Sequence, residues 1–312
     1  MPVQINKIGE IYREIVEEAN RSFKIAIVGR DRVGKSELAA WFLMGNAQYR
    51  DPDIDVFTIV DIDDSELTAE QAVNRSMGSD LIIFVVDASK KIKKSEFAVW
   101  HRLKALKQPV ILVANKVDKV KDPKAAEQNL KNLFNAGPSR FVIVSANEGI
   151  NIETGFIPKV AHLARDFETP LARRFPILRA AVANRIIQRT AAENTIIGAL
   201  VFLPGADMPV MTANQIRMIM KLAIVYGQDL GLERIKELAA VLGSGFAFRT
   251  LARQAAGFVP VLGWAVKGGV AYGGTVALGK AAIKYFEKIE ELAGDQIEVS
   301  PESLRLLETD NR

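Results

Sequence analysis

The segment FKIAIVGRDRVGKS at residues 23–36 limits the fold of this chain more than any other stretch of it. Residues 24–28 are apolar enough for a buried strand, and residues 37–44 have the pattern of a helix. Between them, residues 29–36 follow the pattern G-x-x-x-x-G-K-[ST] in the strand–loop–helix context that this pattern requires. A glycine-rich turn can be purely structural, so the prediction of a phosphate-binding loop depends on further motifs.

The residues of this loop suit a nucleoside polyphosphate. Glycines at both ends allow backbone N–H groups to curl around β-phosphate oxygens with no Cβ atom in the way. We expect Lys35 to reach the β- and γ-phosphates and the Ser36 hydroxyl to bind Mg²⁺. The residues predicted to contact the nucleotide here are Gly29, Arg30, Asp31, Arg32, Val33, Gly34, Lys35, Ser36 and Glu37.

A second motif predicts which base is bound. Residues 110–113 have the composition of an apolar strand, and the box N-K-V-D follows at residues 115–118. A fixed carboxylate at Asp118 can accept hydrogen bonds from the ring N1–H and the exocyclic amine of guanine, whereas adenine has no such donor pair. We expect Asn115 to tie this loop to the phosphate loop and the stem of Lys116 to cover the face of the base.

A further apolar strand, at residues 141–144, is followed by Ser145 and Ala146, whose backbone we expect to meet the guanine O6. The three boxes occur in the order and at the strand ends where an open α/β sheet binds its ligand. On these motifs, the segment 23–165 resembles the Era-like branch of the Ras-type P-loop GTPases. The resemblance implies that the chain binds GTP or GDP together with Mg²⁺.

Strands and helices alternate across this segment, which predicts a mainly parallel sheet covered on both faces. Strands are expected near residues 23–28, 56–60, 81–86, 110–113 and 141–144, and helices near residues 37–44, 67–77, 95–106, 123–135 and 152–165. The predicted fold class is therefore α/β: a P-loop NTPase G domain at residues 23–165, followed by an all-α domain. An amphipathic helix is expected before it, within residues 1–22.

The second half has no convincing strand, so we predict a helical domain at residues 166–294 and a polar tail at residues 295–312. Helices are expected at residues 195–203, 232–242 and 261–292. A further helix is expected to begin at a capping box formed by Thr212 and Gln215 and to end at Gly227. The hairpin at residues 203–207 and the segment Asn214–Ile219 resemble the uncharacterised helical domain that follows Era-like G domains and occurs in YcjF-like membrane proteins. That family has no settled biochemical activity.

The segments that would detect a γ-phosphate differ from the family pattern. The motif D-x-x-G corresponds to residues 61–64, where Asp61 is placed to hold the Mg²⁺ shell with Ser36, but the expected glycine is Asp64. A carboxylate at that position would be repelled by a nearby phosphate. No threonine occurs between residues 36 and 55, and the short spacing predicts that one strand of the usual sheet is missing or reduced. The acidic run at residues 61–64 fits a solvated turn and a metal cluster equally well.

Two residues are candidates for a catalytic role. Lys35 would neutralise charge on the phosphates. Arg32 occupies a position where potassium-dependent Era-like relatives carry asparagine, and its guanidinium could lie along the phosphates; the alternative is that it points to solvent. Because the usual γ-phosphate contacts are incomplete, slow hydrolysis is predicted.

The composition limits the possible partners. The chain has 312 residues, a formal net charge of +4 and no cysteine, so disulfides and thiolate metal sites are excluded and a cytoplasmic location is expected. Three scattered tryptophans make no base-stacking platform, so we expect no nucleic-acid partner. The mean hydropathy of +0.09 leaves three alternatives for the helical half, in order of preference: a soluble bundle, peripheral contact with the inner face of a membrane, and insertion.

Small residues recur at every fourth position in the last expected helix: Ala265, Gly269, Gly273, Ala277 and Ala281. Such a small-residue stripe lets two helix backbones approach closely. We therefore predict that it packs tightly against another helix, either within the domain or across a homodimer.

The leading hypothesis is a guanine-nucleotide-binding switch of the Era-like class with slow, Mg²⁺-dependent GTP hydrolysis. Its helical domain would engage a protein partner or a membrane surface. Two alternatives stay open: a scaffold that binds GTP or GDP without hydrolysing it, and a protein that tethers membranes.

Overall fold

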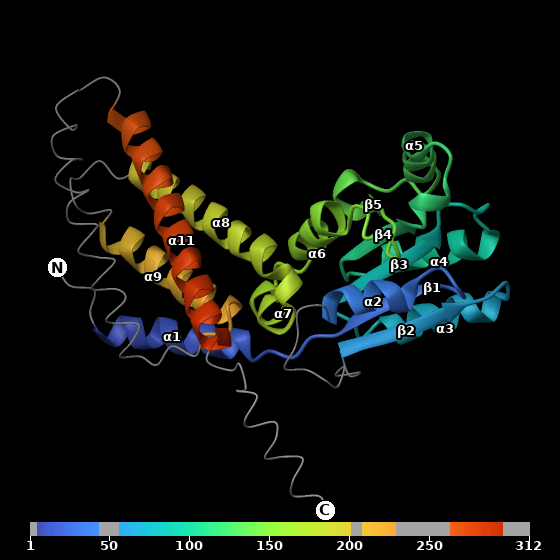
Figure 1. Ribbon diagram of the computed structural model, residues 1–312, viewed down its shortest axis with the longest axis horizontal. Coiled ribbons are helices and arrows are strands. Elements are labelled where there is room, and N and C mark those ends of the chain that lie inside the picture. The colour runs from blue at the N-terminus through green and yellow to red at the C-terminus, as the bar shows by residue number, and fades with distance from the viewer. Residues whose placement is uncertain (1–4, 44–55, 201–207, 229–262, 296–312) are drawn as a thin grey trace, which may run out of the picture. The chain divides into compact units, whose positions relative to one another are not determined.

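The computed structural model describes residues 5–43, 56–200, 208–228 and 263–295. The chain forms two compact units, one of Val16–Arg185 and the other of Met1–Ile15 with Ile186–Arg312 (Figure 1). We describe each unit by itself. The domain limits predicted at residues 22, 165 and 294 stay predictions.

The first unit contains a five-stranded sheet in which every pairing is parallel. Its strands are β1 (Ile25–Arg30), β2 (Phe57–Ile62), β3 (Leu81–Asp87), β4 (Val110–Asn115) and β5 (Phe141–Ile143), in the order β2-β1-β3-β4-β5 (Figure 1). All residues of β3 and β4 are buried, as expected for strands covered on both faces. The predicted α/β fold with a mainly parallel sheet is confirmed. The stretch between Lys35 and Asp61, from which a missing or reduced strand was predicted, includes residues 44–55, which lie outside the described residues.

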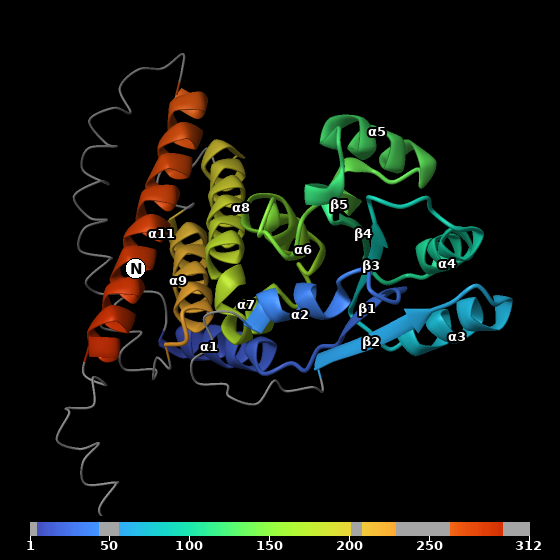
Figure 2. The ribbon, with the colours of Figure 1, turned by 45° about the vertical axis from the view of Figure 1, so that its right-hand side comes forward.

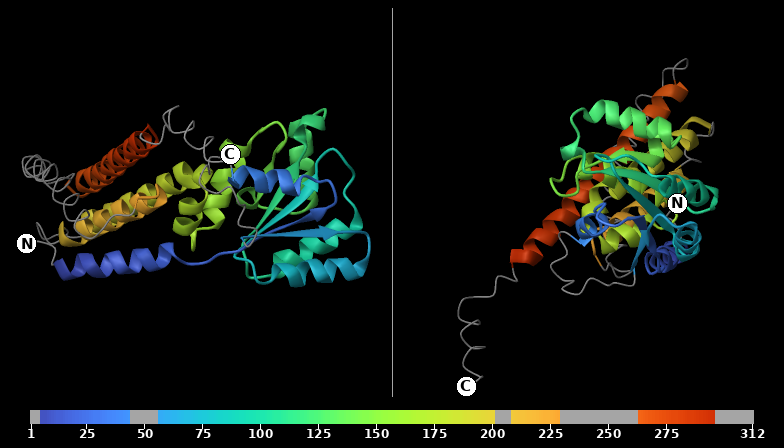
Figure 3. Two further views of the ribbon diagram at one scale, coloured as in Figure 1. Left: turned by 60° about the horizontal axis from the view of Figure 1, so that its bottom comes forward. Right: turned by 90° about the vertical axis from the view of Figure 1, so that its right-hand side faces the viewer.

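Helices cover both faces of the sheet. These are α2 (Lys35–Leu43), α3 (Glu66–Ser76), α4 (Lys94–Ala105), α5 (Pro123–Leu133), α6 (Ile157–Leu163) and α7 (Glu168–Arg174). Short helical segments lie between them. Three are 3₁₀ helices, η2 (Val117–Lys119), η3 (Pro138–Arg140) and η5 (Pro176–Leu178), and one is a short π-helix, η4 (Ile152–Phe156). Figure 2 shows α3 beside β2 and next to α4, and α2 lies on the other side of the sheet (Figure 3, left).

The alternation of side chains along the strands builds two separate apolar layers. On one face, Phe84 of β3 packs with Trp100 of α4 and Phe134, within a core that also includes residues of α3 and α5. On the other face, Phe42 of α2 contacts Phe57 at a ring-centroid distance of 5.3 Å and is also packed against two further phenylalanines near α6 and α7. The sheet is therefore a rigid, doubly covered platform, and its strand ends are free to carry loops.

The helical unit contains α9 (Met208–Val225) and α11 (Gly263–Asp295), and two helices cross into it from the first unit: α1 (Ile5–Ala19) and α8 (Arg179–Leu200). Among the described residues after 166, every element is helical, as predicted. Buried polar groups join three of these helices, because Asn194 of α8 and Gln215 of α9 both donate to the Thr275 hydroxyl of α11, at 3.1 and 3.3 Å.

One detail of the predicted helical half is wrong, and another is right. The capping box at Thr212 and Gln215 does not begin a helix, because α9 already starts at Met208 and Thr212 lies inside it. The same helix does end as predicted, with Gly227 at a φ of 70° just after its last turn. The expected helix at residues 232–242 and the hairpin at residues 203–207 lie outside the described residues.

The small-residue stripe does not form the buried face of α11. Its positions Gly269, Gly273, Ala277 and Ala281 are exposed. The buried face is instead made of Ala271, Thr275, Leu278, Ala282 and Phe286, on roughly the opposite side of the helix. The small-residue stripe therefore does not pack within this domain, and its packing across a homodimer stays a prediction.

Gly279 of α11 is the glycine that does make a close contact. A Cβ atom at this position would lie 2.5 Å from Cγ1 of Ile187 in α8, whereas nothing lies within 4 Å of one at Gly273. We expect Gly279→Leu to lower the free energy of unfolding by about 1–3 kcal/mol through overpacking. The control Gly273→Ala should raise it by up to ~1 kcal/mol, because alanine favours a helix. Urea unfolding of both variants measures this, and an unchanged Gly279→Leu protein would contradict the contact.

In the described part of the chain, none of the helices combines the length and the apolar character needed to cross a bilayer.

Candidate functional site

The predicted motifs meet at the carboxyl edge of the parallel sheet. Gly29, at the end of β1, is in register with Asp61 of β2 on one side and with Val85 of β3 on the other. Asp87 ends β3 and is in register with Asn115, which ends β4. The topology therefore brings to one edge loops that are up to 116 residues apart in the sequence, counting from Gly29 to Ser145. This edge is where open α/β sheets bind their ligands.

The two loop glycines are required by the backbone. A Cβ atom at Gly29 would lie 2.5 Å from the carbonyl oxygen of Val85 in the neighbouring strand. Gly34 has a φ of 97°, and a Cβ atom there would collide with the side-chain amide of Asn115. Arg32 has a φ of 58°, in the left-handed region. Glycine is therefore required at residues 29 and 34, because the backbone of the loop lies close to β3 and to Asn115.

Lys35 is a buried cation at the base of this loop. Its side chain is 7% exposed, and Nζ donates to the carbonyl oxygens of Gly29 at 3.2 Å and Arg30 at 2.6 Å. Nζ also forms an ion pair of 2.6 Å with Asp61, whose side chain is 69% exposed. In this arrangement Asp61 neutralises the cation, and a phosphate group would have to compete with it for the same ammonium.

Asn115 connects all three motifs. Its Nδ2 donates to the carbonyl oxygen of Val33 in the phosphate loop at 2.8 Å, and its Oδ1 accepts from the backbone N–H of Ala146 at 2.9 Å. The Asn115 side chain is buried, so both bonds are shielded from water. The link to the phosphate loop lies where the sequence predicted it, and the link to Ala146 is an addition.

Asp87, which the sequence marks as the residue that ends the strand LIIFVVD, was not among the residues predicted to contact the nucleotide, yet it lies beside them. It is buried, and its carboxylate accepts from Lys116 Nζ at 3.0 Å and from the Ser89 hydroxyl at 2.6 Å. Burial alone would raise the pKa of Asp87, but the hydrogen bonds from Ser89 and Lys116 outweigh it and lower the pKa. Lys116 also donates to the carbonyl oxygen of Arg32. Asp87 therefore fixes the lysine whose stem was predicted to cover the base.

The remaining predicted residues lie around this centre. Asp118 is exposed within the turn η2, Ser145 is buried, and Ser36 and Glu37 are exposed at the start of α2. Arg32 is 88% exposed and forms an ion pair with its neighbour Asp31 at 3.4 Å.

The three aspartates of residues 61–64 do not gather into one cluster. Asp61 faces Lys35, Asp63 accepts from the backbone N–H and the hydroxyl of Ser65 at 2.7 Å, and Asp64 turns to other cations. No group of three metal-binding side chains occurs within the residues that the structure describes. Of the two alternatives left open for this acidic run, the metal cluster formed by the run itself is therefore wrong.

Asp64 is held by two cations. Arg30 contacts it with both terminal nitrogens, at 2.5 and 3.2 Å, and Lys93 Nζ lies 2.8 Å away. The Ser95 hydroxyl donates to the same carboxylate at 3.2 Å, and the Lys93 backbone N–H is fixed by Glu96 at 2.8 Å. Hydrogen bonds from Arg30 and Lys93 hold the pKa of Asp64 below its ordinary value. The residue in place of the usual glycine is thus tied to the phosphate loop through Arg30.

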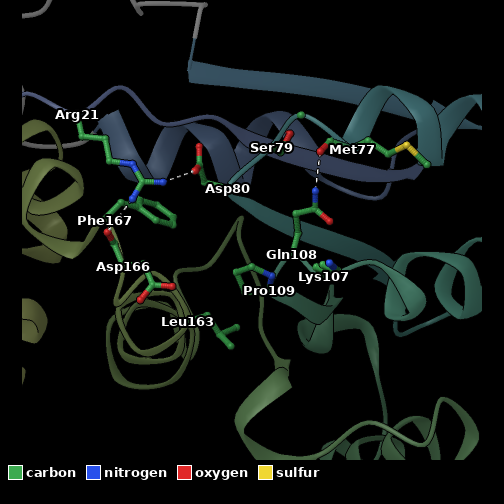
Figure 4. A pocket seen from close by; sticks show the side chains of 11 residues that line it. Arg21, Met77, Ser79, Asp80, Lys107, Gln108, Pro109, Leu163, Asp166 and Phe167 are labelled. Atoms are coloured by element: carbon green, nitrogen blue, oxygen red, sulfur yellow. Dashed lines mark hydrogen bonds and ion pairs between the residues drawn. The ribbon is translucent and has the colours of Figure 1, made fainter.

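A hollow of about 390 Å³ lies at the opposite, amino edge of the sheet (Figure 4). Its polar groups bind one another: Arg21 donates to Asp80 and to the carbonyl oxygen of Asp166, both at 3.2 Å, and Gln108 donates to the carbonyl oxygen of Met77 at 2.6 Å. None of the predicted nucleotide contacts lines it. The hollow is therefore separate from the residues predicted to bind the nucleotide at the carboxyl edge of the sheet.

Two family models match the chain. Residues 70–189 match the Elongation factor Tu GTP binding domain, and residues 162–305 match a domain of unknown function, DUF697. The first match begins after the phosphate loop, so the roles of residues 29–36 depend on their motif and geometry.

Curated relatives are GTPases of the Der and Era types. GTPase Der of Desulfitobacterium hafniense (strain Y51) is 29% identical over 200 residues, which cover 56% of this chain and 44% of Der. GTPase Era of Glaesserella parasuis serovar 5 (strain SH0165) is 30% identical over 183 residues, which cover 48% of this chain and 61% of Era. The chain therefore spans about half the length of these relatives.

Two solved structures are similar at lower identity. A probable GTP-binding protein engB gives a TM-score of 0.37 at 22% identity and covers 46% of this chain and 99% of its own. Era in complex with MgGDPNP and nucleotides 1506–1542 of 16S ribosomal RNA gives 0.35 at 20% identity, over 55% of this chain and 67% of its own. The sequence matches agree with the resemblance stated from the motifs: an elongation-factor-Tu-type GTP-binding domain is followed by a DUF697 domain, with distant homology to Der and Era.

Proposed function

We propose that this protein binds GTP and GDP at the carboxyl edge of its sheet and hydrolyses GTP slowly, as a nucleotide-controlled switch. The observation that carries this proposal is the side chain of Asn115, which is bonded at once to Val33 of the phosphate loop and to Ala146 of the predicted base loop. A purely structural glycine turn would not need such a link. The homology to Der and Era GTPases supports the same activity.

The residues of the site fit a magnesium nucleotide. The cradle left by Gly29 and Gly34 would accept phosphate oxygens, and buried Lys35 would neutralise the β- and γ-phosphates. Mg²⁺ would be held by the Ser36 hydroxyl and, through water, by Asp61, and would supply charge neutralisation at the phosphates. Once phosphate competes for Lys35, the carboxylate of Asp61 is released for that role.

The reaction is the attack of water on the γ-phosphorus of GTP, which gives GDP and inorganic phosphate. The chain's own contribution is positioning and charge: Lys35 and, as a candidate, the exposed Arg32 would stabilise the negative charge that spreads over the transferred group. In the described residues near the site, no glutamine follows Asp61 closely enough to orient water, since Gln71 lies in α3. Slow turnover is the expected consequence.

We expect Asp64→Gly to increase the rate of GTP hydrolysis several-fold. The substitution removes a carboxylate from the neighbourhood of the γ-phosphate and frees the loop from Arg30 and Lys93. Asp64→Asn is the matched variant, because it removes the charge and keeps the size of the side chain. Single-turnover hydrolysis with Mg²⁺ measures both; if neither variant is faster than the wild type, Asp64 does not limit the reaction.

The alternative of a different class is a scaffold in which GTP or GDP is a structural ligand. Phosphate release per site at saturating GTP and Mg²⁺ separates the two. Repeated turnovers that stop when Mg²⁺ is chelated support the switch, and binding without any phosphate release supports the scaffold. A wild-type rate of several per second with no partner present would contradict our prediction of slow hydrolysis.

We propose that the helical half passes the nucleotide state to a protein partner or to a membrane surface on the cytoplasmic side. Co-sedimentation with liposomes in the GTP- and GDP-bound states tests the membrane. Sedimentation equilibrium of the same two states tests the homodimer.

A further inference from the structure

Trp41 of α2 is bonded to the loop that was predicted to meet guanine. Its indole Nε1–H donates to the carbonyl oxygen of Ala146 at 2.8 Å. The ring also lies against Gly149, where a Cβ atom would come within 3.2 Å of the ring atom Cη2. One side chain therefore contacts both ends of the loop 146–149, from a helix that starts at Lys35.

Ala146 is restrained on both of its polar sides. Its N–H donates to Asn115 Oδ1 at 2.9 Å, and its carbonyl accepts from Trp41. Because a trans peptide is planar, the carbonyl of Ala146 and the N–H of Asn147 point in opposite directions. By fixing that carbonyl toward α2, Trp41 also fixes the direction of the Asn147 N–H.

The loop is otherwise short and tightly closed. The Ser145 N–H donates to the carbonyl oxygen of Ile150 at 3.0 Å, and Gly149 has a φ of 69°, which side chains rarely allow. Ala146 itself is buried, whereas Asn147 is exposed. Such a loop has few ways to adjust, so a change in one peptide plane would change the direction of its N–H donors.

We propose that Trp41 is a positioning residue that aligns the Asn147 N–H of this loop with the O6 atom of a guanine base. The inference rests on the proposed binding of guanine nucleotides and adds a determinant of base specificity outside the three motifs. A hydrogen bond weakens steeply when its donor is misaligned, so the Trp41 indole acts on O6 recognition without touching the nucleotide.

The test compares three nucleotides by calorimetry. Relative to GDP, 6-thio-GDP replaces only O6 by a weakly accepting sulfur, and IDP lacks only the amine predicted to bind Asp118. In Trp41→Phe, which removes the N–H and keeps an aromatic ring, GDP affinity should fall about 3- to 10-fold. The ratio of GDP to 6-thio-GDP affinity should fall with it, whereas the ratio of GDP to IDP affinity should be unchanged.

Trp100→Phe is the matched control. Trp100 also donates its Nε1–H to a backbone carbonyl, that of Phe134, at 2.8 Å, but it lies in the core between α4 and β3. The Trp100→Phe substitution should lower the melting temperature of the protein and leave both affinity ratios unchanged. If Trp41→Phe does not fold, the pair Trp41→Gln and Trp41→Leu replaces it. Glutamine and leucine are similar to each other in size, but only glutamine can donate a hydrogen bond to the Ala146 carbonyl. Glutamine should then retain the GDP to 6-thio-GDP ratio and leucine should lose it.

The outcomes separate this inference from the proposed function. A wild-type protein that binds GDP and ADP equally well overturns the proposed function and, with it, the role of Trp41. The role of Trp41 alone is overturned if the wild type prefers GDP to ADP and the Trp41→Phe variant keeps the wild-type ratio of GDP affinity to 6-thio-GDP affinity. An equal loss for all three nucleotides also overturns it, because a merely structural defect would act on each of them alike.

Discussion

Replacing Asp118 by alanine should weaken GDP binding by about 2–4 kcal/mol, or roughly 30- to 700-fold. The carboxylate is the acceptor predicted for two guanine donors at once, and hydrogen bonds to a charged group are the strong ones. Asp118 lies in η2, two residues after Lys116, whose ammonium is held by Asp87 at 3.0 Å. The loop is therefore already in place before a base binds. Asp118→Ala should accordingly lower the affinity for GDP without unfolding the protein.

Calorimetric titration of GDP and ADP into the wild type and Asp118→Ala measures the effect. The wild type should prefer GDP by a similar factor, and the variant should lose most of that preference. Asp122→Ala is the control in the same loop: Asp122 caps α5 by accepting from the Ala125 N–H at 3.0 Å. It should cost about 1 kcal/mol of stability and leave GDP affinity unchanged. Equal affinity of wild-type protein for GDP and ADP would remove the basis for a guanine site.

Replacing Lys35 by alanine is expected to abolish measurable binding of GTP and GDP, a loss of roughly 100-fold or more. Lys35 is the buried cation of the phosphate loop, fixed by two carbonyl oxygens and by Asp61. Without the Lys35 ammonium, the Asp61 carboxylate would lie beside the phosphates with its charge no longer neutralised by Lys35. The expected loss is larger than for any exposed lysine of the domain, because the charge acts in a site shielded from water.

Lys107→Ala provides the matched control for this second variant. Lys107 is exposed at the hollow on the opposite edge of the sheet, so its removal changes the net charge equally without touching the phosphate loop. Binding of GDP to the control should equal that of the wild type. Circular dichroism establishes that Lys35→Ala is folded. A folded Lys35→Ala protein that binds GDP with wild-type affinity would show that the loop is not a phosphate site.

The sequence alone was enough to predict the sheet and the placement of the motifs. Continuous apolar runs predicted five strands, and each run fell on a strand of the sheet. The signal is strongest for β3 and β4, because a strand covered on both faces has no polar side to display. Gly29 and Gly34 were informative because the conformations they adopt exclude other residues. The link from Asn115 to the phosphate loop followed from the motif and the shared sheet edge. The roles of these residues in binding stay predictions until they are measured.

The tertiary structure decided which polar groups meet and which helix faces are buried. Arg30 and Asp64 are 34 residues apart, Asp87 and Lys116 are 29 apart, and Trp41 and Ala146 are 105 apart. No local pattern encodes such pairs, because each depends on the order of the strands and the direction of the loops that leave them. The small-residue stripe of α11 is exposed within its domain for the same reason: periodicity shows that a helix has distinct faces, but only the neighbouring helices determine that Thr275 and Leu278 are buried and Gly273 is not.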